Sequence, residues 1–89
     1  MISHLTEGFR ERFQRLPERI QRTAKKNYLL WKQAPSHPSL EFKRVHPIRP
    51  IYSVRVGIGW RAVGLREGDV MLWFWIGSHN DYEKLIDQL

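Results

Sequence analysis

A histidine and a tyrosine stand three residues apart, directly after the most apolar stretch of the chain. The run VMLWFWI, residues 70–76, ends at a Gly-Ser pair, and His79 and Tyr82 follow it. Open sheets often place functional side chains where a strand ends and a helix begins, because the loop is exposed while the elements beneath hold it rigid. With a reference pKa of about 6.5, a histidine can donate or accept a proton near neutral pH. The sequence therefore predicts acid–base chemistry at this junction; the alternative is that His79 only helps to start a helix.

The positive charge of the chain is concentrated in its first half. Residues 1–44 hold ten Lys or Arg against four Asp or Glu, and residues 45–89 hold five of each, so all of the net charge of +6 lies in the first half. A basic surface confined to one region favours a polyanionic partner, either nucleic acid or an acidic protein segment. A helix with a solvated basic face would have the same composition, so charge alone does not choose between these interpretations.

An apolar stripe with helical spacing runs through residues 9–31. Its members recur every three or four residues, and Asn27 is the one polar interruption. Because proline suits the first turn of a helix and not its interior, Pro17 divides the stripe into a helix of about Thr6 to Leu16 and a longer one of about Pro17 to Ala34. The opposite face of this helix pair carries basic side chains, namely Arg10, Arg12, Arg15, Arg19, Arg22, Lys25, Lys26 and Lys32.

Alternation of apolar and polar residues predicts strands after the proline-rich segment 35–39. LEFKRV (40–45) and IYSVRVG (51–57) alternate in this way, and Gly57 and Gly59 mark a turn into WRAVGLR (60–66). The EGD at 67–69 marks the next turn, into the apolar strand, so three of the strands form an antiparallel meander.

The end of the chain has the pattern of a capped helix. Ser78 is followed three residues later by Asp81, which predicts a final helix of about His79 to Gln88 with Tyr82, Leu85 and Leu89 on one face. The predicted fold class is therefore α+β: an N-terminal helix pair packed on a small, mainly antiparallel sheet of three or four strands, with a short C-terminal helix. At 89 residues, the chain supports a single domain spanning residues 1–89.

The apolar strand presents two different faces if its side chains alternate regularly. Val70, Leu72, Phe74 and Ile76 then share one face, and Met71, Trp73 and Trp75 share the other. The first face suits packing against the helix pair, and the face with two indoles suits a concave surface that a partner or a base could cover. The alternative is that the closing helix alone covers both tryptophans.

Composition excludes several kinds of site. The chain has no cysteine, which rules out disulfides and thiolate-bound zinc, and its four histidines, His4, His37, His46 and His79, lie too far apart in sequence to suggest a metal cluster. We therefore expect no metal and no cofactor. The first residues lack the pattern of a signal peptide, and no apolar stretch approaches the roughly 18 residues that a membrane span needs. These features predict a cytoplasmic protein with no membrane partner.

Three segments along the chain follow an order seen in a known superfamily. They are SLEFKRV (39–45), YSVRVGIGWRAVGL (52–65) and WIGSHNDY (75–82). In this order they resemble the RelE/ParE superfamily of toxins from type II toxin–antitoxin pairs, with its aromatic-Arg strand and its terminal His and Tyr. The resemblance implies an acidic antitoxin as partner and one of two activities: cleavage of messenger RNA on the ribosome, or inhibition of DNA gyrase without cleavage. The resemblance leaves open whether toxin and antitoxin assemble into a larger oligomer.

The resemblance also implies catalytic roles for three side chains. RNA cleavage without a metal needs a base for the 2′-hydroxyl proton, cations for the charge that builds on the phosphate, and an acid for the 5′ leaving oxygen. By resemblance, His79 is the acid or base, Arg61 stabilises the phosphate, and Tyr82 orients the phosphate or stacks on a base. Arg55 is a second guanidinium for the phosphate, and Lys43 and Arg44, which match the superfamily only loosely, add positive charge for substrate binding.

The chain also departs from the superfamily pattern. Members often carry an Arg or Lys between or beside the terminal His and Tyr, whereas Asn80 and Asp81 stand here, and a local acid repels phosphate. Glu41 is the one carboxylate in the first strand, and its place in the alternation fits a solvated residue better than a general base. Arg61 could also be a structural ion-pair partner. We predict a ribosome-dependent messenger-RNA endonuclease; a gyrase inhibitor without nuclease activity and a non-catalytic basic nucleic-acid-binding module are the alternatives.

Overall fold

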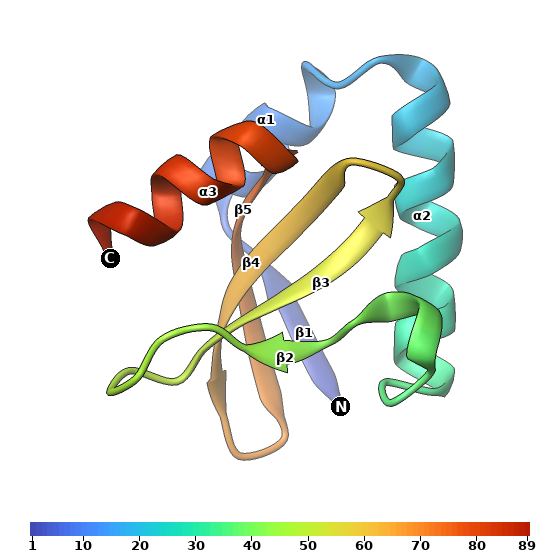
Figure 1. Ribbon diagram of the computed structural model, residues 1–89. Coiled ribbons are helices and arrows are strands. Elements are labelled where there is room, and N and C mark those ends of the chain that lie inside the picture. The colour runs from blue at the N-terminus through green and yellow to red at the C-terminus, as the bar shows by residue number, and fades with distance from the viewer.

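The computed structural model describes all 89 residues and confirms the α+β class. Along the chain it contains β1 (Ile2–Leu5), α1 (Glu7–Gln14), α2 (Glu18–Gln33), the 3-10 turn η1 (Pro38–Leu40), β2 (Lys43–Arg44), β3 (Ile51–Gly57), β4 (Trp60–Glu67), β5 (Val70–Ser78) and α3 (His79–Gln88) (Figure 1). None of the helices is long and apolar enough to span a membrane.

The sheet has five strands in the order β1-β5-β4-β3-β2. β3, β4 and β5 form the antiparallel meander that the sequence predicts. β1 is a further strand that the sequence analysis does not anticipate; it pairs with β5 in parallel, from Ile2 opposite Val70 to Leu5 opposite Trp73. The strand expected over residues 40–45 is reduced to the two residues of β2, because the 3-10 turn and a left-handed backbone at Glu41 (φ 46°, ψ 44°) interrupt it.

The boundary between the two N-terminal helices lies at Pro17, as the sequence predicts. The hydroxyl of Thr6 caps α1 by accepting a hydrogen bond from the Phe9 N–H, and Pro17 stands at the N-cap of α2 with φ −52°. Both helices lie on one face of the sheet, α1 against β5 and α2 against β3. Their apolar side chains join the main core, in which Trp31 of α2 makes an edge-to-face contact with Trp73 of β5 at 5.3 Å between ring centroids.

The opposite face of the sheet is covered by α3. Tyr82 packs in a second, smaller core with Ile51, Val63 and Trp75, and Leu85 and Leu89 complete the covering layer. The cap predicted for this helix is confirmed, because the Ser78 hydroxyl accepts from the Asp81 N–H. We call the two sides of the sheet the helix-pair face, under α1 and α2, and the α3 face.

The predicted alternation along the apolar strand is wrong. Val63 pairs with Trp75 but Gly64 pairs with Trp73, so Phe74 is an extra residue and forms a β-bulge. The bulge reverses the alternation: Met71, Trp73 and Ile76 pack on the helix-pair face, while Trp75 packs under α3. The two tryptophans and Met71 are 5% exposed or less, so the open aromatic surface that the sequence suggested does not exist.

Two glycines make room for these indoles. A Cβ atom at Gly64 would lie 2.8 Å from the Met71 Cε atom and 2.9 Å from the Trp73 ring, and one at Gly77 would lie 2.8 Å from the Trp75 ring. Because these distances are shorter than van der Waals contact, a side chain at either position would displace a tryptophan.

Candidate functional site

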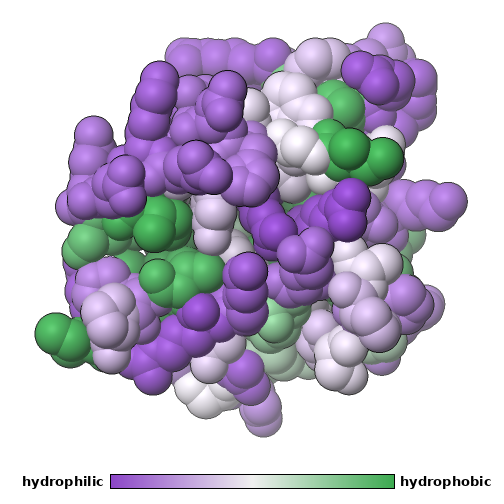
Figure 2. Space-filling model, viewed as in Figure 1, coloured by the Kyte–Doolittle hydropathy of each residue, from purple (hydrophilic) through white to green (hydrophobic).

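Four of the six predicted site residues are brought together on the α3 face. Arg55 of β3 and Arg61 of β4 are direct neighbours across the two strands. His79 is the first residue of α3, and Tyr82 follows one turn later. Figure 2 shows strongly hydrophilic side chains at the middle of this side of the molecule, over β3 and β4.

Arg61 is the central residue of the site. Only 8% of it is exposed, and its Nη2 donates a hydrogen bond of 2.9 Å to Glu41 Oε1. Its guanidinium lies over the ring of Tyr82, with Cζ 5.7 Å from the ring centroid. The Nη1 group is buried and has no hydrogen-bond partner within the protein. Arg61 is therefore held in one position while part of its donor capacity is unused.

Tyr82 connects Arg61 to His79. Its hydroxyl donates to the Ser53 hydroxyl at 3.3 Å, and it is 9% exposed. The ring of His79 meets the ring of Tyr82 edge to face at 5.6 Å between centroids. Tyr82 thus fixes the positions of the two side chains beside it, and its own hydroxyl is engaged inside the protein.

His79 is exposed at the start of α3. Its backbone N–H donates to the Gly59 carbonyl at 2.8 Å, which joins the helix to the β3–β4 turn. Its Nδ1 lies 3.7 Å from Glu83 Oε1, one turn further along the helix. The junction therefore places an imidazole at the surface, against the buried ring that also lies under the Arg61 guanidinium.

Glu41, for which the sequence predicts a solvated side chain, lies against both arginines of the candidate site. Its Oε2 lies 3.5 Å from Arg55 Nη1, so the carboxylate contacts both arginines. The hydrogen bond and charge of Arg61, with the charges of Arg55 and Lys43, lower the pKa of Glu41 from its ordinary value of 4.5. Glu41 has a left-handed backbone, and nothing in the local sequence indicates it, because this conformation is unusual for glutamate.

The two remaining predicted residues differ in position. Lys43 pairs with Ser53 on the same face of the sheet as Arg61 and is exposed. Arg44 is not brought into the site: its guanidinium donates to the carbonyls of His46, Ile48 and Arg49 and so holds the loop before β3. A role for Arg44 in substrate binding stays a prediction without support from its position.

No group of three or more His, Cys, Asp or Glu side chains in the structure could hold a metal ion.

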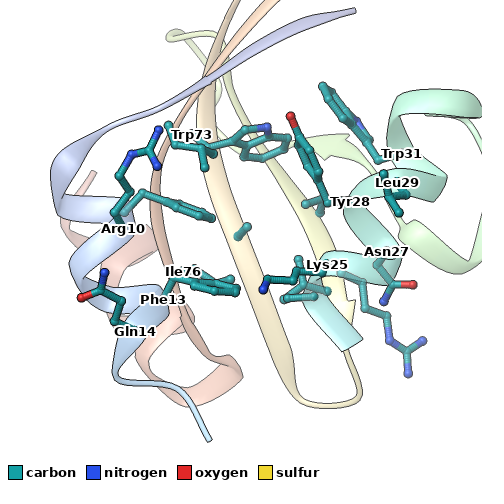
Figure 3. A pocket seen from close by; sticks show the side chains of 17 residues that line it. Arg10, Phe13, Gln14, Lys25, Asn27, Tyr28, Leu29, Trp31, Trp73 and Ile76 are labelled. Atoms are coloured by element: carbon teal, nitrogen blue, oxygen red, sulfur yellow. The ribbon is translucent and has the colours of Figure 1, made fainter. Parts of the chain in front are cut away.

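An apolar groove opens on the other face of the sheet, between α1 and α2. It has a volume of about 570 Å³ and a floor formed by Val54, Ala62, Trp73 and Ile76 from the three central strands. It exists because α1 packs over β5 and α2 over β3, so β4 with its small, buried Ala62 lies between the two helices. Figure 3 shows side chains of the two helices directed toward each other across it, and Lys25 Nζ lies 5.8 Å from the Phe13 ring centroid.

Comparison with known proteins identifies the family. A model of the ParE-like toxin domain matches residues 18–84, so the chain belongs to this family and is a toxin of the RelE/ParE superfamily. No curated protein sequence matches the chain significantly.

Solved structures agree on the fold. The RelB-RelE antitoxin-toxin complex from Methanococcus jannaschii matches with a TM-score of 0.71 and 16% identity, over 91% of this chain and 95% of that one. The isolated RelE toxin from E. coli matches with a TM-score of 0.65 and 15% identity, over 98% and 96%. The archaeal RelE-RelB complex from Pyrococcus horikoshii matches with a TM-score of 0.68 and 12% identity, over 88% and 93%. At these sequence identities the matches show the fold alone.

Proposed function

We propose that this toxin is a ribosome-dependent endonuclease that cleaves messenger RNA without a metal. The observation that carries the proposal is the grouping of Arg61, Arg55, Tyr82 and His79 on one face of the sheet. Guanidinium groups are suited to the charge that builds on a phosphate during attack by the 2′-hydroxyl. An exposed imidazole next to them is suited to a proton transfer in the same reaction.

Each side chain has a defined part in this proposal. Arg61, pre-positioned by Tyr82 and by burial, binds the scissile phosphate through its Nη groups, and Arg55 adds a second guanidinium from the neighbouring strand. His79 makes one of the two proton transfers, since its ring is accessible and its helix start is fixed by the Gly59 carbonyl. Tyr82 holds Arg61 and His79 in place through its ring. The exposed Lys43 adds long-range attraction for the RNA backbone.

A test with a matched control uses two arginines of the same strand. Arg61→Ala should abolish most cleavage of a full-length messenger RNA in a translation extract. Arg66→Ala should keep it, because Arg66 lies over the rings of Phe42 and Tyr52 and not in the site. Equal activity of the two variants would remove the basis of the proposal.

Inhibition of DNA gyrase is the second candidate function, and the acids in the site favour it. Glu41 neutralises Arg61, and Asp81 and Glu83 stand beside His79 on α3. These carboxylates oppose the binding of a phosphate. A supercoiling assay with purified gyrase, run beside the extract assay, separates the two activities: loss of supercoiling with intact messenger RNA would replace the nuclease by the gyrase inhibitor.

We further propose an acidic antitoxin as the partner, with an amphipathic segment seated in the groove. The matching archaeal structures are complexes of a RelE toxin with RelB. Here the groove supplies the apolar surface, and Arg10 and Lys25 among its lining residues supply positive charge. Raising the salt concentration should then slow association strongly and change dissociation little, because exposed charges mainly steer the encounter. Stopped-flow mixing with the product of the adjacent reading frame measures both rates, and a salt effect confined to dissociation would contradict this mode of binding.

A further inference from the structure

Glu41 binds the two arginines in the way that an oxyanion ligand would. One carboxylate oxygen lies 2.9 Å from Arg61 Nη2 and the other lies 3.5 Å from Arg55 Nη1. A phosphodiester presents two free oxygens to guanidinium groups with similar geometry. The carboxylate therefore occupies the position that a substrate phosphate needs.

The site has more donor capacity than Glu41 uses. Arg61 is 8% exposed, and its buried Nη1 group finds no partner in the protein. A buried donor without an acceptor is costly, and a single carboxylate oxygen on Nη2 does not remove that cost. Because Nη1 is shielded from solvent, an incoming anion meets Arg61 at Nη2, the group that Glu41 already occupies.

The backbone at Glu41 is suited to a contact that can be broken. The residue has φ 46° and ψ 44°, a left-handed conformation that costs free energy for any residue with a side chain other than Asn or Asp. It directly follows Leu40, which is fully buried and anchors the 3-10 turn. The side chain of Glu41 itself is 41% exposed. The carboxylate can thus leave the arginines and enter solvent without disturbing the core.

We propose that Glu41 is an internal competitor for the phosphate site, which a substrate phosphate must displace before Arg61 and Arg55 can act on it. This inference rests on the phosphate-binding role proposed above for the two arginines. It has a consequence for specificity: an isolated phosphate or a mononucleotide competes poorly with a tethered carboxylate, because the carboxylate is always present at high effective concentration. A long RNA that is also held elsewhere, for example by the basic surface of α1 and α2, competes well. Glu41 thereby selects substrates that are already fixed on a large polyanionic particle.

The experiment measures anion binding at Arg61 directly, without cleavage. The side-chain Nε–Hε signals of Arg55 and Arg61 are followed in ¹⁵N-HSQC spectra during titration with inorganic phosphate. Glu41→Gln, which keeps the shape and removes the charge, should lower the dissociation constant at Arg61 roughly tenfold or more, the equivalent of one charge-assisted hydrogen bond. Glu18→Gln is the matched control, because Glu18 also pairs with an arginine, at 3.2 Å, but on the exposed face of α2; it should leave the constant unchanged.

The outcomes separate this inference from the proposed function. Equal or weaker phosphate binding by Glu41→Gln would overturn the competitor role, and so would the absence of binding at Arg61 in both proteins. Either result leaves the nuclease proposal to the cleavage assay with Arg61→Ala. If Glu41→Gln does not fold, Glu41→Asp replaces it: its shorter side chain withdraws the carboxylate from Arg61, and it should also tighten phosphate binding.

Discussion

The two faces of the sheet are built from the same three strands and carry opposite chemistry. On β4, Arg61 and Val63 point toward α3, whereas Ala62 and Gly64 point toward the helix pair. The α3 face therefore gathers charged and titratable groups, and the helix-pair face gathers aromatic rings around an apolar groove whose lining contains no Asp, Glu or His. Because successive residues of a strand alternate between faces, each face can change without the other.

This separation matters for a toxin that has to be held inactive. An antitoxin seated in the groove would contact Trp73 and Lys25 and need not touch His79 or Arg61. Its affinity would come from apolar burial, and the chemistry would come from the other side of the sheet. Arg55 is the exception, because it belongs to the site on the α3 face and also lines the groove. Variants of the other residues on each face should then affect one property and spare the other.

The largest effect is expected from His79→Ala. Loss of an acid–base group usually reduces a rate by about 10²–10⁴. Cleavage of messenger RNA in the translation extract should fall by this amount, while the affinity for the antitoxin and the near-UV circular dichroism stay unchanged. His37→Ala is the control, because this histidine is exposed in the α2–β2 segment and its side chain hydrogen-bonds only to Ser39. A parallel loss of antitoxin affinity in His79→Ala would mean that the two faces are not independent.

Trp73→Ala should have the largest effect on the helix-pair face. Trp73 is 2% exposed and packs against Trp31 and Phe42. Removing a buried tryptophan typically costs about 3–5 kcal/mol of unfolding free energy. Urea unfolding followed by tryptophan fluorescence measures this loss. Leu72→Ala, on the same strand but 37% exposed, should cost much less; similar costs for the two variants would show that Trp73 is not the side chain that β5 buries under the helix pair.

Gly64→Ala tests the close packing beneath Trp73 on a smaller scale. The added methyl group would meet Leu72 O and Met71 Cε, each at 2.8 Å, so a core side chain has to move. Overpacking of this kind costs about 1–3 kcal/mol. The thermal midpoint should fall, whereas Gly8→Ala in α1, with only the Thr6 hydroxyl at 3.9 Å, should not lower it. An unchanged midpoint in Gly64→Ala would argue against the placement of Met71 and Trp73.

Sequence patterns were reliable where a few neighbouring residues determine the structure. Pro17 divides α1 from α2, and Ser78 caps α3, because proline geometry and a cap hydrogen bond involve only residues within one turn. The glycines of the β3–β4 turn predict that the two strands carrying Arg55 and Arg61 are antiparallel neighbours, but not that these two residues face each other, because the register is irregular beside Arg55.

The features that sequence could not give depend on distant parts of the chain. β1 forms only because β5 offers it an edge, and its four residues carry little pattern of their own. The bulge at Phe74 is set by the fit of Trp73 against Trp31 and of Trp75 under α3, which regular alternation does not encode. Glu41 enters the site through a left-handed backbone in what looked like a strand. Each of these is a tertiary preference that overrides a local one.

The smallest expected effect is a pH dependence confined to the α3 face. The hydrogen bond and charge of Arg61 hold the pKa of Glu41 below its ordinary value of 4.5 in the folded state, so the folded protein favours the ionised carboxylate more than the unfolded chain does. The stability that Glu41 contributes is therefore fully present above the unfolded pKa and is lost as the pH falls through the lower, folded pKa.

The difference in urea midpoint between the wild-type protein and Glu41→Gln should be positive at pH 7 and shrink below about pH 4.5. Glu18→Gln, which removes an ion pair between two exposed side chains, should change the midpoint little at any pH. A difference between wild type and Glu41→Gln that stays constant from pH 7 to pH 3 would show that Glu41 does not pair with Arg61 in solution, and the α3 face would then hold two unneutralised arginines.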